Sequence, residues 1–535
     1  MTATAARPDD AFHVYDTTLR DGAQREGITY SVPDKLAVAR LLDELGVGFI
    51  EGGWPGAMPK DTEFFARARE ELALSSAELV AFGATRKPGV TAARDAQVQA
   101  LLDARTPVVT LVAKSDVRHV TQALRTTLEE NLAMVTDTVA LLVAEGRRVF
   151  LDLEHFFDGY QDDRDYGLRV IDAAMNAGAD VAVLCDTNGG MLPMGIHRVV
   201  TEVFDRSGGR RLGIHCQDDT GCAVANTLTA VEAGVSHVQC TANGYGERTG
   251  NADLFAVVGD LETKLDRRVL PDGRLREMVR VSHALAEIAN IAPDTHQPFV
   301  GVSAFAHKAG LHASAIKVSP DLYNHLDPRV VGNDMRVLVT EMAGRASIEL
   351  KGKELGYDLS GDRESLGRLV DQVKDLESRG YTFEAADASF ELLLRDTVAG
   401  ERRRHFRVES WRAIVEQRAD GEVMSEATVK VHALDQRIIA TGEGNGPVNA
   451  LDNALRSALA QAFPELAQLE LTDYKVRILE GREGTAAVTR VLIETSDGKG
   501  EWDTVGVHQN VIAASWNALE DAITYGLLRA GRDDD

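Results

Sequence analysis

The stretch RLGIHCQDDTGCAVAN, residues 211–226, runs from an apolar segment through a polar turn into a second apolar segment. Its first six residues predict a short strand, and a helix is predicted to begin near Ala223. Polar side chains from His215 to Asp219 stand between the two. This order of strand, polar turn and helix predicts one unit of a parallel α/β fold.

The same unit recurs along the first half of the chain. Amphipathic segments such as DKLAVARLLDELG, residues 34–46, separate the predicted strands and carry apolar residues at helical spacing. Eight βα units in about 240 residues are what a (β/α)8 TIM barrel requires, so this α/β fold is predicted. The eight predicted strands cover residues 12–19, 49–54, 78–85, 107–113, 148–155, 181–187, 211–216 and 237–244.

Polar residues follow five of the predicted strands. In a TIM barrel the carboxyl ends of the strands carry the catalytic side chains. One polar group at a strand end is usually a helix cap or a turn residue, but five converging clusters predict an active site. The clusters are Arg20, Asp21 and Gln24 after strand one, Glu154 at strand five, Asp186 to Asn188 at strand six, His215 to Asp219 at strand seven, and Asn243 to Asn251 after strand eight.

Length, charge and hydropathy limit the class of protein. A chain of 535 residues should hold two or three domains, because single cores rarely exceed about 250–300 residues. A net charge of −25 argues against nucleic acid as a partner. No apolar run approaches the ~20 residues of a membrane span, so no membrane partner is expected. The opening MTATAARPDD does not resemble a secretory signal, which predicts a cytoplasmic protein.

The barrel is predicted over residues 12–265 and a mostly helical linker over residues 266–384. Residues 385–530 differ in character, because three strands and a helix occur there twice. The helices that close the two copies are predicted over residues 447–463 and 510–528. A duplicated βββα unit without catalytic residues of its own predicts a C-terminal α+β domain with a regulatory or dimerising role.

Five motifs relate the chain to a known family. They are DTTLRDGAQREG (16–27), IEGGWPG (50–56), EHFFDGY (154–160), LCDTNGG (184–190) and NGYGERTGN (243–251). Through them the chain resembles the acyl-CoA-dependent Claisen condensing enzymes, which include 2-isopropylmalate, homocitrate and citramalate synthases. Within that family it most resembles the long citramalate synthase branch, over residues 12–530.

The resemblance implies an acyltransferase that condenses acetyl-CoA with pyruvate to give citramalate and free CoA, in the biosynthesis of isoleucine. It also implies a divalent metal, a homodimer, and feedback by an amino acid such as isoleucine. Backbone donors for that ligand are expected in EGNGPVNA, residues 443–450, and around residues 481–485.

The resemblance assigns roles to the residues at the strand ends. Asp21 matches a metal-binding carboxylate, and Arg20 matches the residue that supports the carbonyl oxygen of the substrate. Glu154 matches a glutamate near the substrate, and Thr187 the hydroxyl that binds the 2-oxo acid carboxylate. Two further residues are assigned at the same strand ends, Gln24 to substrate binding and Asn251 to support of the metal ligands.

Two residues of the helical linker match the family's proton-transfer residues, His312 in AGLHASA and Tyr323 in LYNHLDP. An imidazole is a reasonable base or relay near pH 7. Removing a proton from a thioester methyl is too difficult for an isolated imidazole, so a carboxylate or a water network should assist.

Strand seven departs from the family pattern His-x-His-Asn-Asp. The chain has Gln217 at the second histidine position and Asp218 at the asparagine position. A glutamine can coordinate through its amide oxygen, and hard ions accept oxygen ligands better than zinc does. We therefore expect Asp21, His215 and Gln217 to bind Mn2+ or Mg2+, with Zn2+ as the alternative. Cys216 and Asp218 are other candidates, disfavoured because adjacent residues on a strand point to opposite faces.

Several alternatives remain at this stage. The substrate could be another 2-oxo acid, as in a 2-isopropylmalate synthase, and Gln217 could mark an inactive paralogue. Lyases that cleave hydroxymethylglutaryl-CoA fit less well, because they are shorter, lack the repeated domain and carry a cysteine loop where this chain has GYGERTGN. Biotin-dependent carboxyltransferases share the barrel but need a modified lysine ligand for which the sequence offers no clear position.

Overall fold

The computed structural model describes residues 11–359, 361–400, 404–479 and 486–531. The chain divides into two compact units. Unit 1 comprises Met1–Phe305 and Leu326–Asp334, and unit 2 comprises Ala306–His325 and Met335–Asp535. The domain boundaries expected at residues 265 and 384 stay predictions. The opening ten residues and residues 481–485, for which the sequence makes predictions, lie outside the described ranges.

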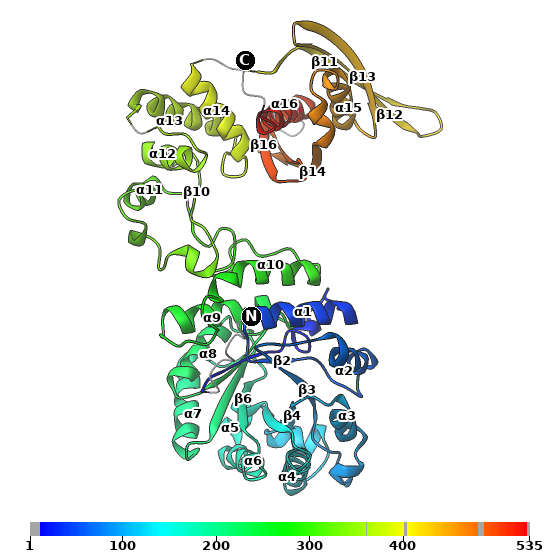
Figure 1. Cartoon of the computed structure of the whole chain (residues 1–535), viewed down its shortest axis with the longest axis vertical. Helices are drawn as coiled ribbons and strands as arrows, with labels where there is room; N and C mark the ends of the chain where they lie inside the picture. The colour runs from blue at the N-terminus through cyan, green and yellow to red at the C-terminus, as the bar shows by residue number, and fades with distance from the viewer. Residues whose placement is uncertain (1–10, 360, 401–403, 480–485, 532–535) are drawn as a thin grey trace, which may run out of the picture. The chain divides into compact units, whose positions relative to one another are not determined.

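Unit 1 contains a closed barrel of eight parallel strands in sequential order, with β8 pairing back onto β1 (Figure 1). The predicted (β/α)8 barrel is therefore confirmed, and each predicted strand overlaps an observed one. The strands are β1 His13–Asp16, β2 Phe49–Glu51, β3 Glu78–Ala84, β4 Val108–Lys114, β5 Arg148–Glu154, β6 Val181–Asp186, β7 Arg211–Cys216 and β8 His237–Cys240.

Helices surround the barrel, and the local sequence fixes where they begin and end. Ser31 starts the first helix with a capping box to Asp34, and Gly46 ends it in the left-handed region at φ 101°. The helices of unit 1 are α1 Val32–Leu45, α2 Pro59–Glu71, α3 Ala96–Ala104, α4 Leu128–Ala144, α5 Phe156–Asp162, α6 Arg164–Asn176, α7 Pro193–Arg206, α8 Ala223–Glu232, α9 Leu254–Thr263 and α10 Met278–Ala289.

The inside of the barrel is packed at one end only. Tyr15, Phe49, Phe150 and Val183 form a buried cluster there, with rings of Phe49 and Phe150 in edge contact. Large inward-facing side chains fill the interior of an eight-stranded barrel. Polar residues replace them toward the carboxyl ends of the strands, where they line a cavity of small-molecule size.

Unit 2 begins with a short parallel pair, β9 Ala306–His307 and β10 Arg336–Val337. Helices follow, as the sequence predicts for the linker. They are α11 Gly310–Ile316, α12 Arg345–Glu354, α13 Arg363–Ser378 and α14 Asp387–Ala399. Ile348, Leu369 and Phe390 join the last three in one buried cluster.

The rest of unit 2 is the duplicated βββα unit that the sequence predicts. Each copy is a three-stranded antiparallel sheet followed by a helix. Val429 and Leu455 of the first copy share one core with Ile493 and Leu519 of the second. The elements are β11 Phe406–Gln417, β12 Val423–Ala433, β13 Gln436–Gly444 and α15 Pro447–Leu459, then β14 Glu470–Ile478, β15 Thr489–Ser496, β16 Glu501–His508 and α16 Val511–Arg529.

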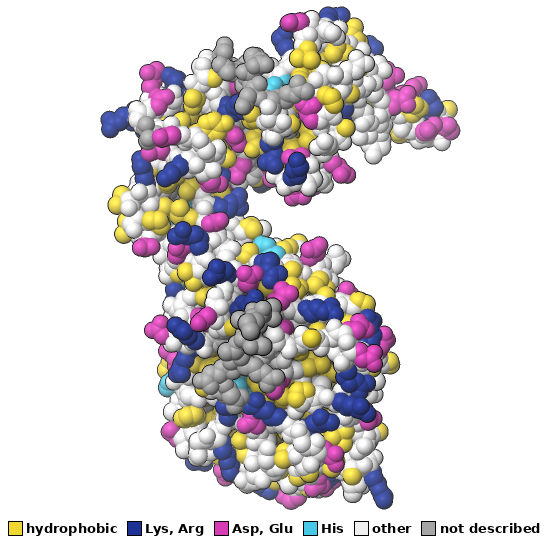
Figure 2. Space-filling model, in the orientation of Figure 1, with side chains coloured by type: hydrophobic (Ala, Val, Ile, Leu, Met, Phe, Trp, Pro, Cys, Tyr) yellow, Lys and Arg dark blue, Asp and Glu magenta, His cyan; other side chains and the backbone are white. Residues whose placement is uncertain are grey.

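Acidic and basic side chains are interspersed on the face of each unit that Figure 2 shows. None of the helices in the described ranges combines the length and apolar character that a bilayer crossing requires.

Candidate active site

Most of the side chains singled out in the sequence surround one cavity of about 460 Å³ in unit 1. It lies where the carboxyl ends of the barrel strands meet, which is where a TIM barrel carries its active site. The predicted site residues that line it are Arg20, Asp21, Gln24, Glu154, Thr187, His215 and Gln217.

Three side chains from two strand ends form a buried polar group in the cavity. His215 Nε2 lies 3.3 Å from Asp21 Oδ2, and Gln217 Nε2 lies 3.4 Å from both of these atoms. All three side chains are buried. Burial raises the pKa of Asp21, but Arg20 and the hydrogen bond with His215 outweigh it and hold that pKa well below its usual range. Asp21 is therefore an anion.

Two amide oxygens beside this group have no hydrogen-bond partner among the described residues. Gln217 Oε1 and Asn251 Oδ1 are both buried and unpaired. Asn251 reaches the group because residues 217 and 251 pair in an isolated β-bridge, and its Nδ2 donates to Tyr245 O at 3.0 Å. A buried acceptor without a donor costs about 1–3 kcal/mol, so these oxygens need a positively charged or donating partner.

The described residues contain no cluster of three or more His, Cys, Asp or Glu side chains placed to hold a metal ion. The group at Asp21 combines one carboxylate and one imidazole with the side-chain amides of Gln217 and Asn251. Amides are not among the four residue types of such a cluster. Amide and carboxylate oxygens are ligands that hard divalent cations accept. The donor set thus fits a hard cation better than a soft one.

The two alternative ligands on strand seven face elsewhere. Asp218 Oδ1 accepts a hydrogen bond from Ala223 N at the start of α8, at 2.8 Å. Cys216 is buried in the apolar core of unit 1. The alternation of side chains along β7 explains this, because His215 and Gln217 share the inward face.

Arg20 is held by a residue that the sequence interpretation passed over. Its Nε donates to Glu51 Oε2 at 2.5 Å, and its guanidinium lies 3.9 Å from the centroid of Phe82. Glu51 is fully buried and also accepts hydrogen bonds from Tyr15 and Thr17. Its position at the end of β2, inside IEGGWPG, was the signal that could have found it.

Glu154 and Thr187 each bond to a residue at the carboxyl end of the preceding strand. Glu154 forms an ion pair with Lys114, which ends β4 and also lines the cavity. Thr187 Oγ1 accepts a hydrogen bond from the backbone N–H of His155 at 2.8 Å. Because that oxygen already accepts, the hydroxyl proton of Thr187 remains available to a ligand.

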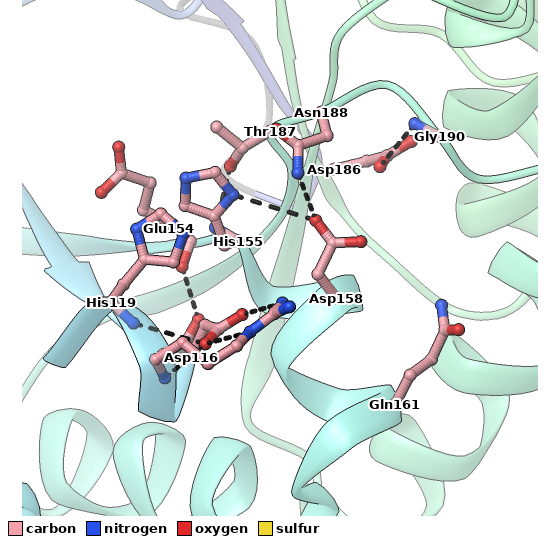
Figure 3. A network of polar contacts seen from close by, with 12 residues as sticks. Asp116, His119, Glu154, His155, Asp158, Gln161, Asp186, Thr187, Asn188 and Gly190 are labelled. Atoms are coloured by element: carbon pink, nitrogen blue, oxygen red, sulfur yellow. Dashed lines mark hydrogen bonds and ion pairs between the residues drawn. The ribbon is translucent and has the colours of Figure 1, made fainter. Parts of the chain in front are cut away.

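Figure 3 shows the surroundings of this pair. The ring of His155 stacks on His119, with centroids 3.9 Å apart, and His155 has a left-handed backbone at φ 57°. Asp158 receives a hydrogen bond from Asn188 Nδ2 at 2.6 Å. A non-glycine residue held in the left-handed region is often found at a functional site.

The comparisons with known proteins agree with this arrangement. The HMGL-like family model matches residues 11–288, a homocitrate synthase post-HMGL domain-like model residues 299–380, and a LeuA allosteric (dimerisation) domain model residues 384–527. A curated (R)-citramalate synthase of Streptomyces coelicolor is 69% identical over 99% of both chains, and one of Synechocystis is 48% identical over 96% of both.

The chain belongs to the (R)-citramalate synthase family. A probable 2-isopropylmalate synthase of Methanopyrus kandleri is a more distant relative, 32% identical over 98% of this chain and all of its own. The two citramalate synthases, at 69% and 48% identity, are thus more similar to the chain than this relative, although all three matches cover both units.

The two residues predicted to transfer protons in this member of the citramalate synthase family lie in unit 2. His312 is on α11 and Tyr323 follows it, and their rings stack with centroids 4.0 Å apart. The nearby His307 forms a hydrogen bond through its Nε2 with Asn324 Oδ1 at 2.8 Å. The structure therefore brings His312 and Tyr323 to each other, and their part in proton transfer stays a prediction.

Proposed function

We propose that the chain condenses acetyl-CoA with pyruvate to give (R)-citramalate and free CoA. The identity of 69% to the Streptomyces coelicolor (R)-citramalate synthase over 99% of both chains supports this substrate pair most strongly. The geometry of the cavity supports the chemistry, because a cationic side chain, a hydroxyl donor and an oxygen-rich group face one small space.

The group at Asp21 is proposed to hold a divalent cation through Asp21, His215 and Gln217, with Asn251 supporting them. The unpaired oxygen of Gln217 fits the role of a ligand, because a cation would satisfy it. Such a cation would polarise the carbonyl of the 2-oxo acid as a Lewis acid. We propose Mn2+ or Mg2+ rather than Zn2+, because two of the three ligands offer oxygen.

The side chains of the cavity then have separate tasks. Arg20, fixed by Glu51, would donate hydrogen bonds to the oxygen that becomes an alkoxide when the new carbon–carbon bond forms. The free proton of Thr187 would bind the carboxylate of the 2-oxo acid. Glu154 and Gln24 line the same cavity and would contact the substrates.

Proton removal from the acetyl methyl is proposed for His312, with Tyr323 beside it. The stacked rings support a joint role, since Tyr323 restrains the imidazole against rotation. A base must lie within hydrogen-bond reach of the proton that it removes.

Release of CoA with a panel of 2-oxo acids tests the proposal. A thiol-trapping assay should show the fastest release with pyruvate and none without a 2-oxo acid. Fastest release with 2-oxoisovalerate would reassign the chain to isopropylmalate synthesis. Cleavage of hydroxymethylglutaryl-CoA would indicate a lyase, and release of no CoA with any acid would indicate an inactive paralogue.

We further propose that residues 385–530 bind isoleucine and help to form a homodimer. The match to the LeuA allosteric (dimerisation) domain supports both roles. An exposed apolar surface supports the second. Ile414 and Ile439 pair with Glu426 and Lys430 of β12, and their side chains are about half exposed. They lie on the sheet face away from the core, because Val429 and its alternate neighbours on β12 point inward.

A further inference from the structure

One peptide group beside the cavity is hydrogen-bonded on both sides. It joins Glu154, the last residue of β5, to His155. Its N–H donates to Thr187 Oγ1 at 2.8 Å. Its carbonyl oxygen accepts hydrogen bonds from Ser115 Oγ at 2.8 Å and from the backbone N–H of Ser115 at 3.3 Å. Ser115 is fully buried, so water does not compete for its bonds, and the peptide group links the ends of β4 and β6.

The direction of this peptide group goes with an unusual backbone at His155. Its φ of 57° and ψ of 35° lie in the left-handed region, which few residues other than glycine adopt. His155 immediately precedes α5, and its side chain makes no capping hydrogen bond with that helix. Such a conformation persists where the surrounding structure over-determines it.

The ring of His119 is the contact that holds His155 in place. The two imidazoles stack with their centroids 3.9 Å apart and their planes 25° from parallel (Figure 3). His119 itself begins a π-helical turn, His119–Ala123, a rare form that is frequent at functional sites. Only 12% of the His155 side chain is exposed, so the stack is largely shielded from water.

Thr187 is anchored through both of its oxygens. Its hydroxyl oxygen accepts from His155, and its backbone carbonyl accepts from Arg248 Nη2 at 2.9 Å. A hydroxyl that accepts in this way still has one proton to donate. Because Thr187 lines the cavity, that proton can be given to a ligand there.

We propose that His155, stacked on His119, is a positioning residue. Its left-handed backbone directs its N–H to Thr187 Oγ1, and this bond fixes the hydroxyl that binds the carboxylate of the 2-oxo acid. The inference rests on the role proposed for Thr187, but the bond between His155 and Thr187 can be measured with no substrate and no metal.

The first experiment measures this bond in the full-length chain. The sequence has 14 histidines, so ¹⁵N-histidine labelling gives few amide signals, and the signal lost in His155→Asn belongs to His155. Its amide should exchange slowly with solvent in the parent and about 10-fold faster in Thr187→Val, which keeps the shape of threonine without the acceptor. Equal exchange rates in these two proteins would overturn the proposal.

Thr138→Val is the matched control for exchange. Thr138 is also a buried threonine of unit 1, and its Oγ1 accepts from the backbone N–H of Arg86 at 3.0 Å. Its replacement should leave exchange at His155 unchanged. Faster exchange in this variant would attribute the effect to general loosening of the barrel and would count against the proposal.

Substitutions at position 155 then test the backbone through the kinetics of CoA release. His155→Val places a β-branched residue in the left-handed region, where it is strained. KM for the preferred 2-oxo acid should rise by about 10-fold, with kcat and KM for acetyl-CoA close to those of the parent, because the lost contact is to a carboxylate that does not react. His155→Gly adopts the same backbone without strain and should keep the parent KM.

His119→Ala removes the stack and leaves His155 in place, so it should raise the same KM by a smaller factor. An unchanged KM in His155→Val or in His119→Ala would overturn the proposal. An equal rise in His155→Gly and His155→Val would also overturn it, since the imidazole and not the backbone would then be responsible.

Arg105→Val is the control for strain. Arg105 has a left-handed backbone at φ 56°, is exposed at the end of α3 and does not line the cavity. Its replacement should leave both KM values unchanged, and a rise would count against the proposal. If the parent released no CoA with any 2-oxo acid but the His155 amide responded to Thr187→Val, the proposed function would fail while the positioning of Thr187 held.

Discussion

At the scale of the residue, the proposed ligand Gln217 should decide how firmly a divalent cation is held. Its amide oxygen donates less strongly than an imidazole, so chelation should abolish CoA release readily and Mn2+ or Mg2+ should restore it. Gln217→His should keep activity or shift it toward softer metals. Gln217→Ala should weaken metal binding, with a water blunting the loss.

The matched comparison is with the two stronger ligands. Asp21→Ala and His215→Ala should each cost more than the ~10- to 100-fold that loss of a supporting residue typically costs, because water replaces these ligands poorly. Metal titrations of CoA release measure all four variants. Unchanged metal dependence in Gln217→Ala would mean that Gln217 supports the site without binding the ion.

Glu51 illustrates a second effect at the residue scale, the loss of stability when a buried charge has no partner. Glu51→Gln should leave the guanidinium of Arg20 without its main counter-charge and destabilise unit 1 by about 3–5 kcal/mol. Urea unfolding followed by circular dichroism measures this change. Glu71→Gln is the control, since its ion pair with Arg67 is on the surface and should contribute little. Equal midpoints for the two variants would contradict the prediction.

At the scale of the element, the third strand of each C-terminal repeat approaches its helix at a glycine. A Cβ on Gly506 of β16 would lie 2.0 Å from Ala514 O of α16. Gly442 of β13 meets Ala450 and Ala454 of α15 in the same way. The two repeats thus share this close contact between a strand and a helix backbone, as well as the same order of strands and helix.

This contact predicts that Gly506→Ala is destabilising by about 1–3 kcal/mol, because the added methyl group must push α16 away from β16. Gly446→Ala is the control, since its Cβ would meet no atom within 4 Å. Thermal unfolding followed by tryptophan fluorescence is suitable, because Trp411, Trp502 and Trp516 all lie in this part of unit 2. A Gly506→Ala midpoint no lower than that of Gly446→Ala would refute the contact.

At the scale of the whole molecule, the proposed regulation belongs to residues 385–530, whereas the proposed catalytic residues lie in the barrel and, for His312 and Tyr323, in the linker. Isoleucine should lower CoA release by the full-length chain, and deletion of residues 386–535 should remove that inhibition. Sedimentation should show a dimer for the full-length chain and the loss of that dimer in the deletion variant. A 1–385 fragment with unchanged feedback sensitivity would place the isoleucine site elsewhere.

The sequence by itself determined the barrel, the linker helices and the duplicated unit, because strands and helices follow from local periodicity. It also indicated which residues line the cavity, since Asp21, Glu154 and His215 each stand at a strand end that a barrel brings together. These inferences need only the order of residues along the chain.

Only the tertiary structure decided which side chains support those residues. Glu51 meets Arg20 across 31 positions of sequence, and Gln239 joins His215 to Asp152 across 24 and 87. Such contacts arise where the closed barrel brings side chains of distant strands together, and no local pattern encodes them. The sequence also did not show that Gln217 Oε1 lacks a hydrogen-bond partner among the described residues. Whether a buried atom finds a partner depends on every element that surrounds it.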